Sequence, residues 1–149
     1  MTTVDEAGPA VSERSMSQVV TETVRAFRAQ VPDCTVAALV DMSTGMLLAV
    51  DTLEDYPGDE LDLLAAATFD LFQGRNVGII ADVLNGGKAD RHYFQEMVVQ
   101  SETLLHIFLR SAKSEDLVAV VVCRRAANMG MLFAQARVVM RQMDADFSG

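Results

Sequence analysis

Apolar side chains along this chain recur with two spacings, one typical of helices and one typical of buried strands. The first helical set comprises Met16, Val19, Val20, Val24, Phe27 and Val31. Pro32 is expected to end this helix, because a proline disfavours the helical conformation in the residue before it. Continuous apolar runs at 34–41 and 46–51 flank a short turn with Gly45, which predicts a β-hairpin. Since neither run alternates with polar residues, we expect both faces of the sheet to be covered.

The middle of the chain predicts one long helix over residues 60–84, whose apolar residues occupy nearly the whole circumference. A helix that is apolar all round must be covered on more than one side. One sheet covers one side, so we expect a second copy of the helix, from another subunit, to cover the other. Gly74 and Gly78 lie one turn apart and would let two such helices approach closely. The alternative is a helix that two glycines merely soften.

Three further apolar runs at 92–101, 103–111 and 116–123 predict strands in succession, and the first is the most polar, as expected at a sheet edge. Asn128 is expected to cap a closing helix. The apolar stripe of that helix comprises Met129, Leu132, Phe133, Ala136, Met140 and Met143. The order helix, strand, strand, helix, three strands and helix lacks the alternation typical of parallel sheets. We therefore predict an α+β sandwich with a mainly antiparallel sheet and helices on both faces.

The composition suits one domain, since the chain has 149 residues of which 50% are hydrophobic. Residues 1–15 are small, polar and acidic and predict a flexible tail, followed by a domain over 16–143 and a short C-terminal tail at 144–149. The net charge of −9 opposes binding to nucleic acid. No apolar run reaches the roughly 20 residues of a membrane helix, and the N-terminus lacks the pattern of a secretory signal. We therefore expect a cytoplasmic protein without direct membrane insertion.

No chemistry-bearing motif stands out in the sequence. The six carboxylates within 51–62 lack the order of a calcium-binding loop and are expected to be solvated. Cys34 and Cys123 form no metal-binding pair and are expected to be buried and reduced. His92 and His106 fall in different predicted strands, and nucleotide-binding glycine loops and nucleophile motifs are absent. We predict no cofactor, no metal site and no enzymatic activity.

Three passages, taken together and in order, resemble the roadblock (dynein light chain) family, in particular its bacterial members. They are VAALVDMSTGMLLAV at 36–50, DELDLLAAATFDLFQGRNVG at 59–78 and NMGMLFAQARVVMRQM at 128–143. The last is similar to the Asn-Leu-Gly-Leu helix start of the family, with Met at both Leu positions. The resemblance implies a profilin-like fold with a five-stranded sheet of order 2-1-5-4-3. It also implies that Cys34 lies near Cys123.

The resemblance further implies a homodimer, joined through the third strand and the paired middle helices. The predicted contacts are Leu64, Leu71, Gly74, Gly78, Phe94 and Val98. Family members are non-catalytic scaffolds and regulators of small Ras-like GTPases, and bacterial members regulate gliding-motility GTPases. We therefore predict a homodimeric regulator that modulates the cycle of such a GTPase, with activation of GTP hydrolysis as one form that this regulation takes in the family.

The surface expected to bind this GTPase is the outer side of the middle helix. Its predicted contacts are Phe69, Asp70, Gln73 and Asn76. Two alternatives to GTPase regulation remain open at the level of the sequence. One is a structural assembly adaptor without a nucleotide-dependent partner. The other is a small-molecule sensor module with a pocket between sheet and helices.

Overall fold

The computed structural model describes residues 14–84, 86, 93–125 and 128–148. The helices and strands are α2 (Met16–Gln30), β1 (Cys34–Asp41), β2 (Met46–Thr52), α3 (Gly58–Gln73), α4 (Arg75–Leu84), β3 (Glu96–Gln100), β4 (Leu104–Arg110), β5 (Leu117–Arg124) and α5 (Met129–Ser148). The predicted succession is confirmed, except that the middle helix is divided in two. Most of the expected N-terminal tail, and His92, lie outside the described residues.

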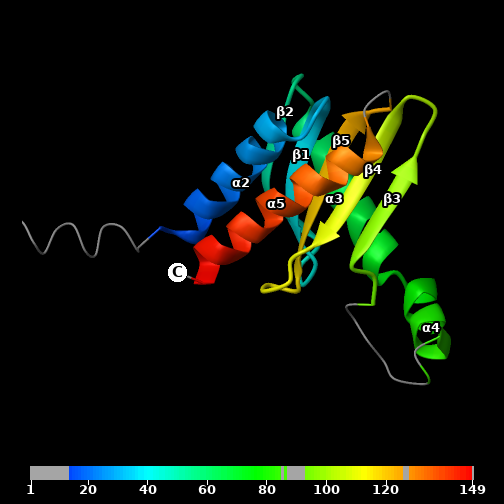
Figure 1. Ribbon diagram of the computed structural model, residues 1–149. Coiled ribbons are helices and arrows are strands. Elements are labelled where there is room, and N and C mark those ends of the chain that lie inside the picture. Colours follow the sequence, from blue (N-terminus) through cyan, green and yellow to red (C-terminus); the bar gives the residue numbers. More distant parts are fainter. Residues whose placement is uncertain (1–13, 85, 87–92, 126–127, 149) are drawn as a thin grey trace, which may run out of the picture.

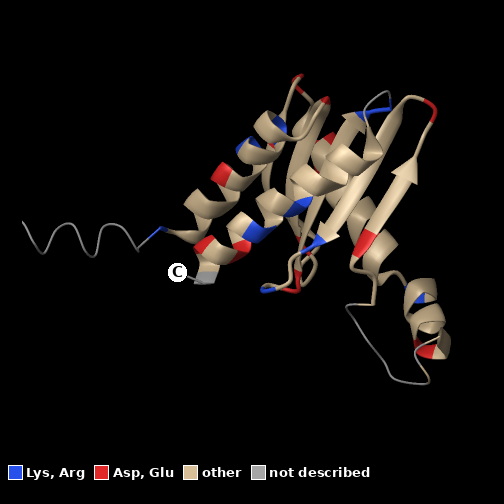
Figure 2. Cartoon of the chain, viewed as in Figure 1, with Lys and Arg blue, Asp and Glu red and all other residues tan. Residues whose placement is uncertain are grey.

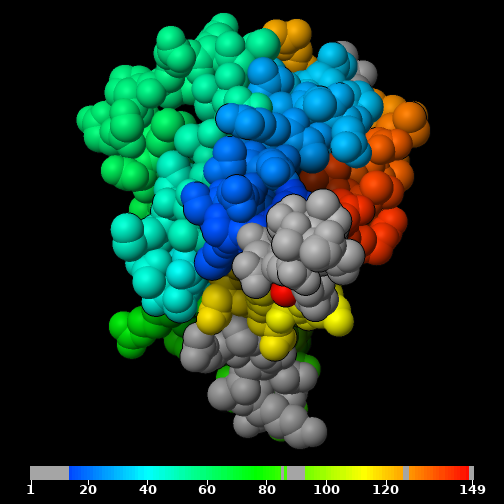
Figure 3. All heavy atoms as spheres, turned by 90° about the vertical axis from the view of Figure 1, so that its left-hand side faces the viewer, coloured from blue at the N-terminus to red at the C-terminus, as the bar shows by residue number. Residues whose placement is uncertain are grey.

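The five strands form one sheet in the order β2-β1-β5-β4-β3, and all neighbouring strands are antiparallel. Helices α2 and α5 lie side by side on one face of the sheet, and α3 lies on the other (Figure 1). From the side, α2 lies between the β1–β2 hairpin and α5 (Figure 3). The predicted fold class, the strand order 2-1-5-4-3 and the helices on both faces are therefore confirmed.

Two hydrophobic clusters form, one on each face, because successive side chains of a strand point to opposite faces. The cluster beneath α2 and α5 includes Phe27, Leu39, Ile107, Leu132 and Met143. The cluster beneath α3 includes Val40, Met42, Phe72, Phe108 and Val120. Strands β1 and β5 are buried on both faces, as their continuous apolar runs predict. The same expectation is wrong for β2, which lies at the sheet edge and has no fully buried residue.

The continuous middle helix predicted over 60–84 is wrong, because the chain leaves the helical conformation at Gly74. Its backbone is extended there, with φ −61° and ψ 157°, and its N–H donates to the carbonyl of Asp70. A Cβ at this position would lie 2.5 Å from that same carbonyl oxygen, so a glycine is required. Gly74 therefore separates α3 from α4 and does not serve to bring two continuous helices together.

The third strand is shorter than predicted, since β3 spans Glu96–Gln100 and residues 93–95 precede it without strand structure. Tyr93 and Phe94 pack edge to face there, with ring centroids 5.2 Å apart. Phe94 is half-buried and packs against the cluster beneath α3. The predicted edge position of the strand is confirmed.

The closing helix begins as predicted, because the Asn128 side chain accepts a hydrogen bond from the N–H of Met131 at 3.1 Å. Its predicted stripe is buried or half-buried apart from Met129, which is exposed in the first turn. The helix runs to Ser148, so residues 144–148, expected in a tail, belong to α5. Asp144 is buried, and its carboxylate accepts hydrogen bonds from the Ser111 hydroxyl and the Ala112 N–H. This pair of bonds fixes α5 to the turn that follows β4.

Replacing Asp144 with Ala is expected to lower the free energy of unfolding by about 2 kcal/mol, because the buried Ser111 hydroxyl loses its acceptor. Urea denaturation measures the loss. Asp146→Ala is the matched control, since that carboxylate is 3.4 Å from Arg14 at the surface and such pairs contribute less than about 1 kcal/mol. Equal losses for the two variants would show that Asp144 has no special structural role.

Candidate functional site

Eight large apolar side chains on α3, α4 and β3 are exposed, and together we call them the exposed apolar surface. They are Leu63, Leu71, Ile79, Ile80, Val83, Leu84, Val98 and Val99. Exposing side chains of this size to water costs free energy, which contact with another chain would recover. The surface is therefore the first candidate for an interaction with another protein.

The orientation of α3 explains why part of its apolar circumference stays exposed. Ala65, Thr68 and Phe72 are buried against the sheet. Leu63 projects from the opposite side of the helix, and Leu71 from one flank. The other flank faces the β1–β2 turn, so the flank with Leu71 faces the β3 side of the molecule. Among the described residues, one chain leaves Leu63 68% exposed and Leu71 38% exposed.

Helix α4 projects away from the sheet beyond β3 (Figure 1). Of its ten residues only Ala81 is fully buried, and Val83 is 72% exposed. Its charged residues, Arg75 and Asp82, lie near its two ends, and the residues between them are uncharged (Figure 2). A short helix with so little contact to its own chain gains little packing energy as a monomer. Contact with a second chain would supply it.

Strand β3 leaves one edge of the sheet open. The Gln95 carbonyl accepts from the Arg110 N–H, and the Ser101 N–H donates to the Leu104 carbonyl. Hydrogen-bonded and non-hydrogen-bonded pairs alternate along an antiparallel ladder. The register of β3 against β4 therefore turns the backbone N–H and C=O groups of Glu96, Val98 and Gln100 toward the open edge. Such an edge is a template for a strand of another chain.

A buried arginine holds α3 and the segment before β3 in place. The guanidinium of Arg110 lies over the ring of Phe72, 5.1 Å from the ring centroid. Its Nε donates to the Phe94 carbonyl at 2.9 Å, and its Nη1 donates to the Glu115 carbonyl at 2.6 Å. Phe72 also packs edge to face on Phe108, with centroids 6.0 Å apart. The exposed apolar surface therefore rests on a well-ordered layer.

Glu96, at the start of β3, is tied to the opposite face of the sheet. The Arg137 guanidinium of α5 donates to its two carboxylate oxygens, at 2.9 and 2.7 Å. These hydrogen bonds lower the pKa of the Glu96 carboxyl below its ordinary value. The Arg137 guanidinium also lies 4.8 Å from the ring centroid of Phe133. The ion pair therefore fixes the first residue of the edge strand while its backbone stays open.

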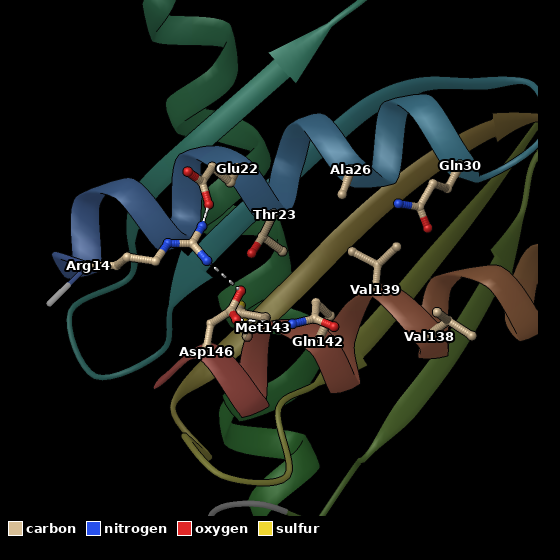
Figure 4. A pocket seen from close by; sticks show the side chains of 10 residues that line it. All are labelled: Arg14, Glu22, Thr23, Ala26, Gln30, Val138, Val139, Gln142, Met143 and Asp146. Carbon is tan, nitrogen blue, oxygen red and sulfur yellow. Dashed lines mark hydrogen bonds and ion pairs between the residues drawn. The ribbon is translucent and has the colours of Figure 1, made fainter. Parts of the chain in front are cut away.

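A groove of about 360 Å³ lies between α2 and α5 on the other face (Figure 4). Its mouth carries the ion pairs of Arg14 with Glu22 and with Asp146. Inside it, the Thr23 hydroxyl already donates to the Val19 carbonyl at 2.7 Å. The groove lies between two helices, and not between sheet and helices as the sensor alternative requires.

In the part of the chain that the structure describes, no three His, Cys, Asp or Glu residues lie close enough together to hold a metal ion. Burial lowers the pKa of His106, which lies half-buried on β4. None of the described helices is both long enough and apolar enough to cross a membrane.

Comparisons of the sequence with protein-family models and with curated proteins find no match. Comparison of the structure with solved structures finds several. MglB in a tetrameric arrangement is 20% identical with a TM-score of 0.68, and the match covers 90% of this chain and 92% of that one. The gliding protein MglB from Thermus thermophilus is 18% identical with a TM-score of 0.69, covering 90% and 93%. A Roadblock/LC7 domain from Streptomyces avermitilis is 19% identical with a TM-score of 0.63, covering 91% and 100%.

The chain has the roadblock fold. The match extends over nine-tenths of the chain, and it includes the sheet order and the placement of helices on both faces. At this level of identity the likeness concerns the fold. The function of this chain has to be argued from its own side chains.

Of the six predicted dimer contacts, some are exposed and others pack within the chain. Leu71 and Val98 belong to the exposed apolar surface, and Gly78 is exposed with open space around it. Leu64 and Phe94 instead pack, half-buried, against the cluster beneath α3. With Gly74 at the helix break, three of the six positions support the fold of the chain itself.

The four predicted GTPase contacts are also divided. Asp70 and Asn76 are exposed. Phe69 and Gln73 are half-buried, and the ring of Phe69 lies 3.8 Å from the position of a Cβ on Gly45. The Phe69 ring therefore lies on the flank beside the β1–β2 turn and not on the outermost side of the helix. All four GTPase contacts stay predictions.

Sequence reasoning missed most of the exposed apolar surface. The missed residues are Leu63, Ile79, Ile80, Val83, Leu84 and Val99. The apolar circumference of the middle helix was the available signal. It did not identify the individual residues, because the break at Gly74 rotates and redirects α4 relative to α3.

Proposed function

We propose that this protein is a non-catalytic, cytoplasmic homodimer that binds a small Ras-like GTPase and regulates its cycle. The proposal has two parts, self-association and GTPase binding. Self-association rests on the exposed apolar surface and on the open edge of β3. GTPase binding rests on the resemblance of the sequence to roadblock proteins and on the fold that this chain shares with MglB.

The exposed apolar surface is the observation that carries self-association. Leu71 lies on the flank of α3 that faces β3, and the side chains of Val98 and Val99 lie on the two faces of the open edge strand. A second copy can cover both features at once, by adding its own β3 to the edge and packing its own α3 and α4 against those of the first copy. A two-fold axis beside β3 brings the same surface of both copies together, and no charged side chain of this surface repels its copy.

Val98→Pro tests the strand part of this interface. The proline removes the Val98 N–H that faces the open edge and leaves the ladder to β4 intact, which an edge strand tolerates. By symmetry the dimer loses two backbone hydrogen bonds, so the dissociation constant is expected to rise by about 10-fold or more. Sedimentation across a dilution series measures the change.

Val99→Pro is the matched control for this experiment. The alternation of the ladder turns the Val99 N–H inward, toward β4, so the same substitution breaks a bond within the chain. This variant is expected to lose thermal stability, whereas Val98→Pro keeps it. A Val98→Pro protein that dimerises like the wild type would show that β3 does not pair across the interface.

The GTPase part is tested by capture in defined nucleotide states. A small Ras-like GTPase encoded in the same genome is loaded with GDP or with a non-hydrolysable GTP analogue, and its binding to the immobilised protein is measured. A regulator binds one state more tightly, and we expect a preference of about 10-fold or more. Asp70→Lys, at an exposed position of α3, is expected to weaken capture, whereas Asp146→Lys, on the opposite face, is the matched control.

The result also separates this function from the assembly adaptor. An adaptor binds its partner equally in both nucleotide states, because its contacts do not depend on the nucleotide. Equal binding of the GDP and GTP states would therefore favour the adaptor. Absence of binding by a protein that still dimerises would remove the GTPase from the proposal and leave self-association in place.

A further inference from the structure

Two cysteines far apart in the sequence lie directly opposite each other in the sheet. Cys34 is the first residue of β1, and its partner in the antiparallel register is Cys123 of β5. Opposed residues of an antiparallel pair have Cα atoms about 4.5 or 5.5 Å apart. Disulfides join residues whose Cα atoms are about 4.4–6.8 Å apart. The register therefore brings the two Cα atoms into the range of a disulfide, beside a β-bulge between Cys34 and Val36.

Both thiols also point to the same side of the sheet. Cys34 and Cys123 belong to the cluster beneath α2 and α5, so the two side chains share one face. Opposed residues on one face have their Cβ atoms about 4.5–5.5 Å apart. Both residues are free cysteines in this structure. A disulfide needs Cβ atoms about 3.5–4.5 Å apart, so the bond forms when the two strand ends approach each other slightly.

We propose that Cys34 and Cys123 form a disulfide-exchange site, which closes to a cross-strand disulfide when the protein meets a low-molecular-weight disulfide. In this reaction Cys34 is the attacking residue and Cys123 the resolving residue. The assignment of roles follows from access and from the neighbouring groups.

Access favours Cys34. It is 6% exposed, whereas Cys123 is 0% exposed. Cys34 also begins a strand, directly after Asp33, whose positive φ of 55° is uncommon for a residue other than glycine. Cys34 and Cys123 lie at the same end of the β1–β5 pair, and Cys34 is the more exposed of the two, so its sulfur is reached first when that end opens locally.

The neighbouring groups favour the same order. A hydrogen bond from Cys123 lowers the pKa of the Cys34 thiol, and the positive charge of Arg28 adds to this effect although burial opposes it. The Arg28 Nη1 donates to the Cys34 carbonyl at 2.8 Å, which holds that charge beside the residue. The same pairing raises the pKa of Cys123. Cys34 therefore ionises first, and the thiolate is the nucleophile in exchange.

The exchange proceeds in two balanced steps. The Cys34 thiolate attacks one sulfur of the small disulfide, forms a mixed disulfide and expels one small thiolate, which takes up the proton that Cys34 lost. Cys123 then gives up its proton and attacks the Cys34 sulfur, forming the Cys34–Cys123 bond and expelling the second small thiol. The protein loses two protons and two electrons, and the small disulfide takes them up and is reduced to two thiols.

The test uses the folded, full-length protein and bis(2-hydroxyethyl) disulfide, which leaves the nine methionines untouched. After incubation at mildly alkaline pH, free thiols are titrated and the intact mass is measured. We expect both thiols to disappear together, with loss of two hydrogens and no retained mercaptoethanol. Peptide mapping is expected to link the peptides that contain Cys34 and Cys123. Persistent thiols, or stable mercaptoethanol adducts on the wild type, would overturn the proposal.

Two variants test the order of attack. Cys123→Ala is expected to trap one mercaptoethanol on Cys34, because the resolving thiol is gone. Cys34→Ala is expected to leave Cys123 unreacted, because its sulfur is buried. Alanine suits both sites, since it is small and apolar like the thiol it replaces. An adduct on Cys123 in the Cys34→Ala protein would overturn the assigned roles.

Melting temperature provides a second readout. The bond would close a loop of about 90 residues, and a crosslink of that length is expected to raise the melting temperature by about 10 °C. If the oxidised protein melted at or below the melting temperature of the reduced protein, the proposal that the fold accommodates a Cys34–Cys123 disulfide would be contradicted. The site lies beneath α2 and α5, away from the exposed apolar surface, so the oxidised protein is expected to keep its mass in solution. The outcome of the disulfide test is therefore independent of the proposed function.

Discussion

Leu71→Asp is expected to convert the protein from a dimer into a monomer of 16.2 kDa. Leu71 lies on the flank of α3 that faces β3 and is 38% exposed in the single chain. In a dimer that covers this flank, the substitution buries a carboxylate in each copy without a counter-charge. Such burial costs several kcal/mol, so the dissociation constant is expected to rise by about 100-fold or more. Light scattering across a dilution series measures the mass of both proteins.

Val138→Asp is the matched control for this experiment. Val138 is 44% exposed on α5, on the opposite face of the sheet, and the substitution is chemically similar. This variant is expected to dimerise like the wild type. If Leu71→Asp also dimerised normally, the flank of α3 would not be part of the interface. A wild-type protein that stays monomeric at every concentration would refute self-association. The exposed apolar surface would then be expected to bind a different protein.

Phe72→Ala is expected to lower the free energy of unfolding by about 3–5 kcal/mol. Phe72 is 1% exposed and fills the space between α3 and the sheet. Its removal leaves a cavity beside Phe108, and it takes away the ring beneath the Arg110 guanidinium. Urea denaturation at matched protein concentration measures the loss.

Phe69→Ala makes the same chemical change one turn earlier on the same helix. Phe69 is only half-buried, so less apolar area is lost and a smaller cavity forms. The expected loss is about half of that for Phe72→Ala or less. If both variants lost the same stability, α3 would not be anchored mainly through Phe72, and the layer beneath the exposed apolar surface would need another explanation.

The fold was largely predictable from the sequence because its patterns are local and unambiguous. The continuous apolar runs of β1 and β5 predict central strands, and the runs around Gly45 predict the hairpin. The stripe that ends at Met143 predicts a helix on one face. The strand order came from the resemblance to roadblock proteins, since nothing in periodicity specifies which strands become neighbours.

The predictions that were wrong share one physical reason. The break at Gly74 depends on a contact between a glycine and a carbonyl four residues earlier, which no hydrophobic pattern records. The extension of α5 to Ser148 depends on a buried Asp144 that finds its partners 32 and 33 residues earlier in the chain. In each case a specific contact in the folded chain overrides a local preference.

The sequence by itself determined the types of the elements, their order and the apolar excess of the middle helix, because these follow from periodicity and composition. Only the tertiary structure decided which apolar side chains stay in contact with water and which backbone groups of β3 face the open edge. It also decided the register that sets Cys34 opposite Cys123 at one end of the β1–β5 pair, a proximity that the resemblance had implied without the register. Exposure and register are properties of the packed chain, since both depend on which surfaces the other elements have already covered.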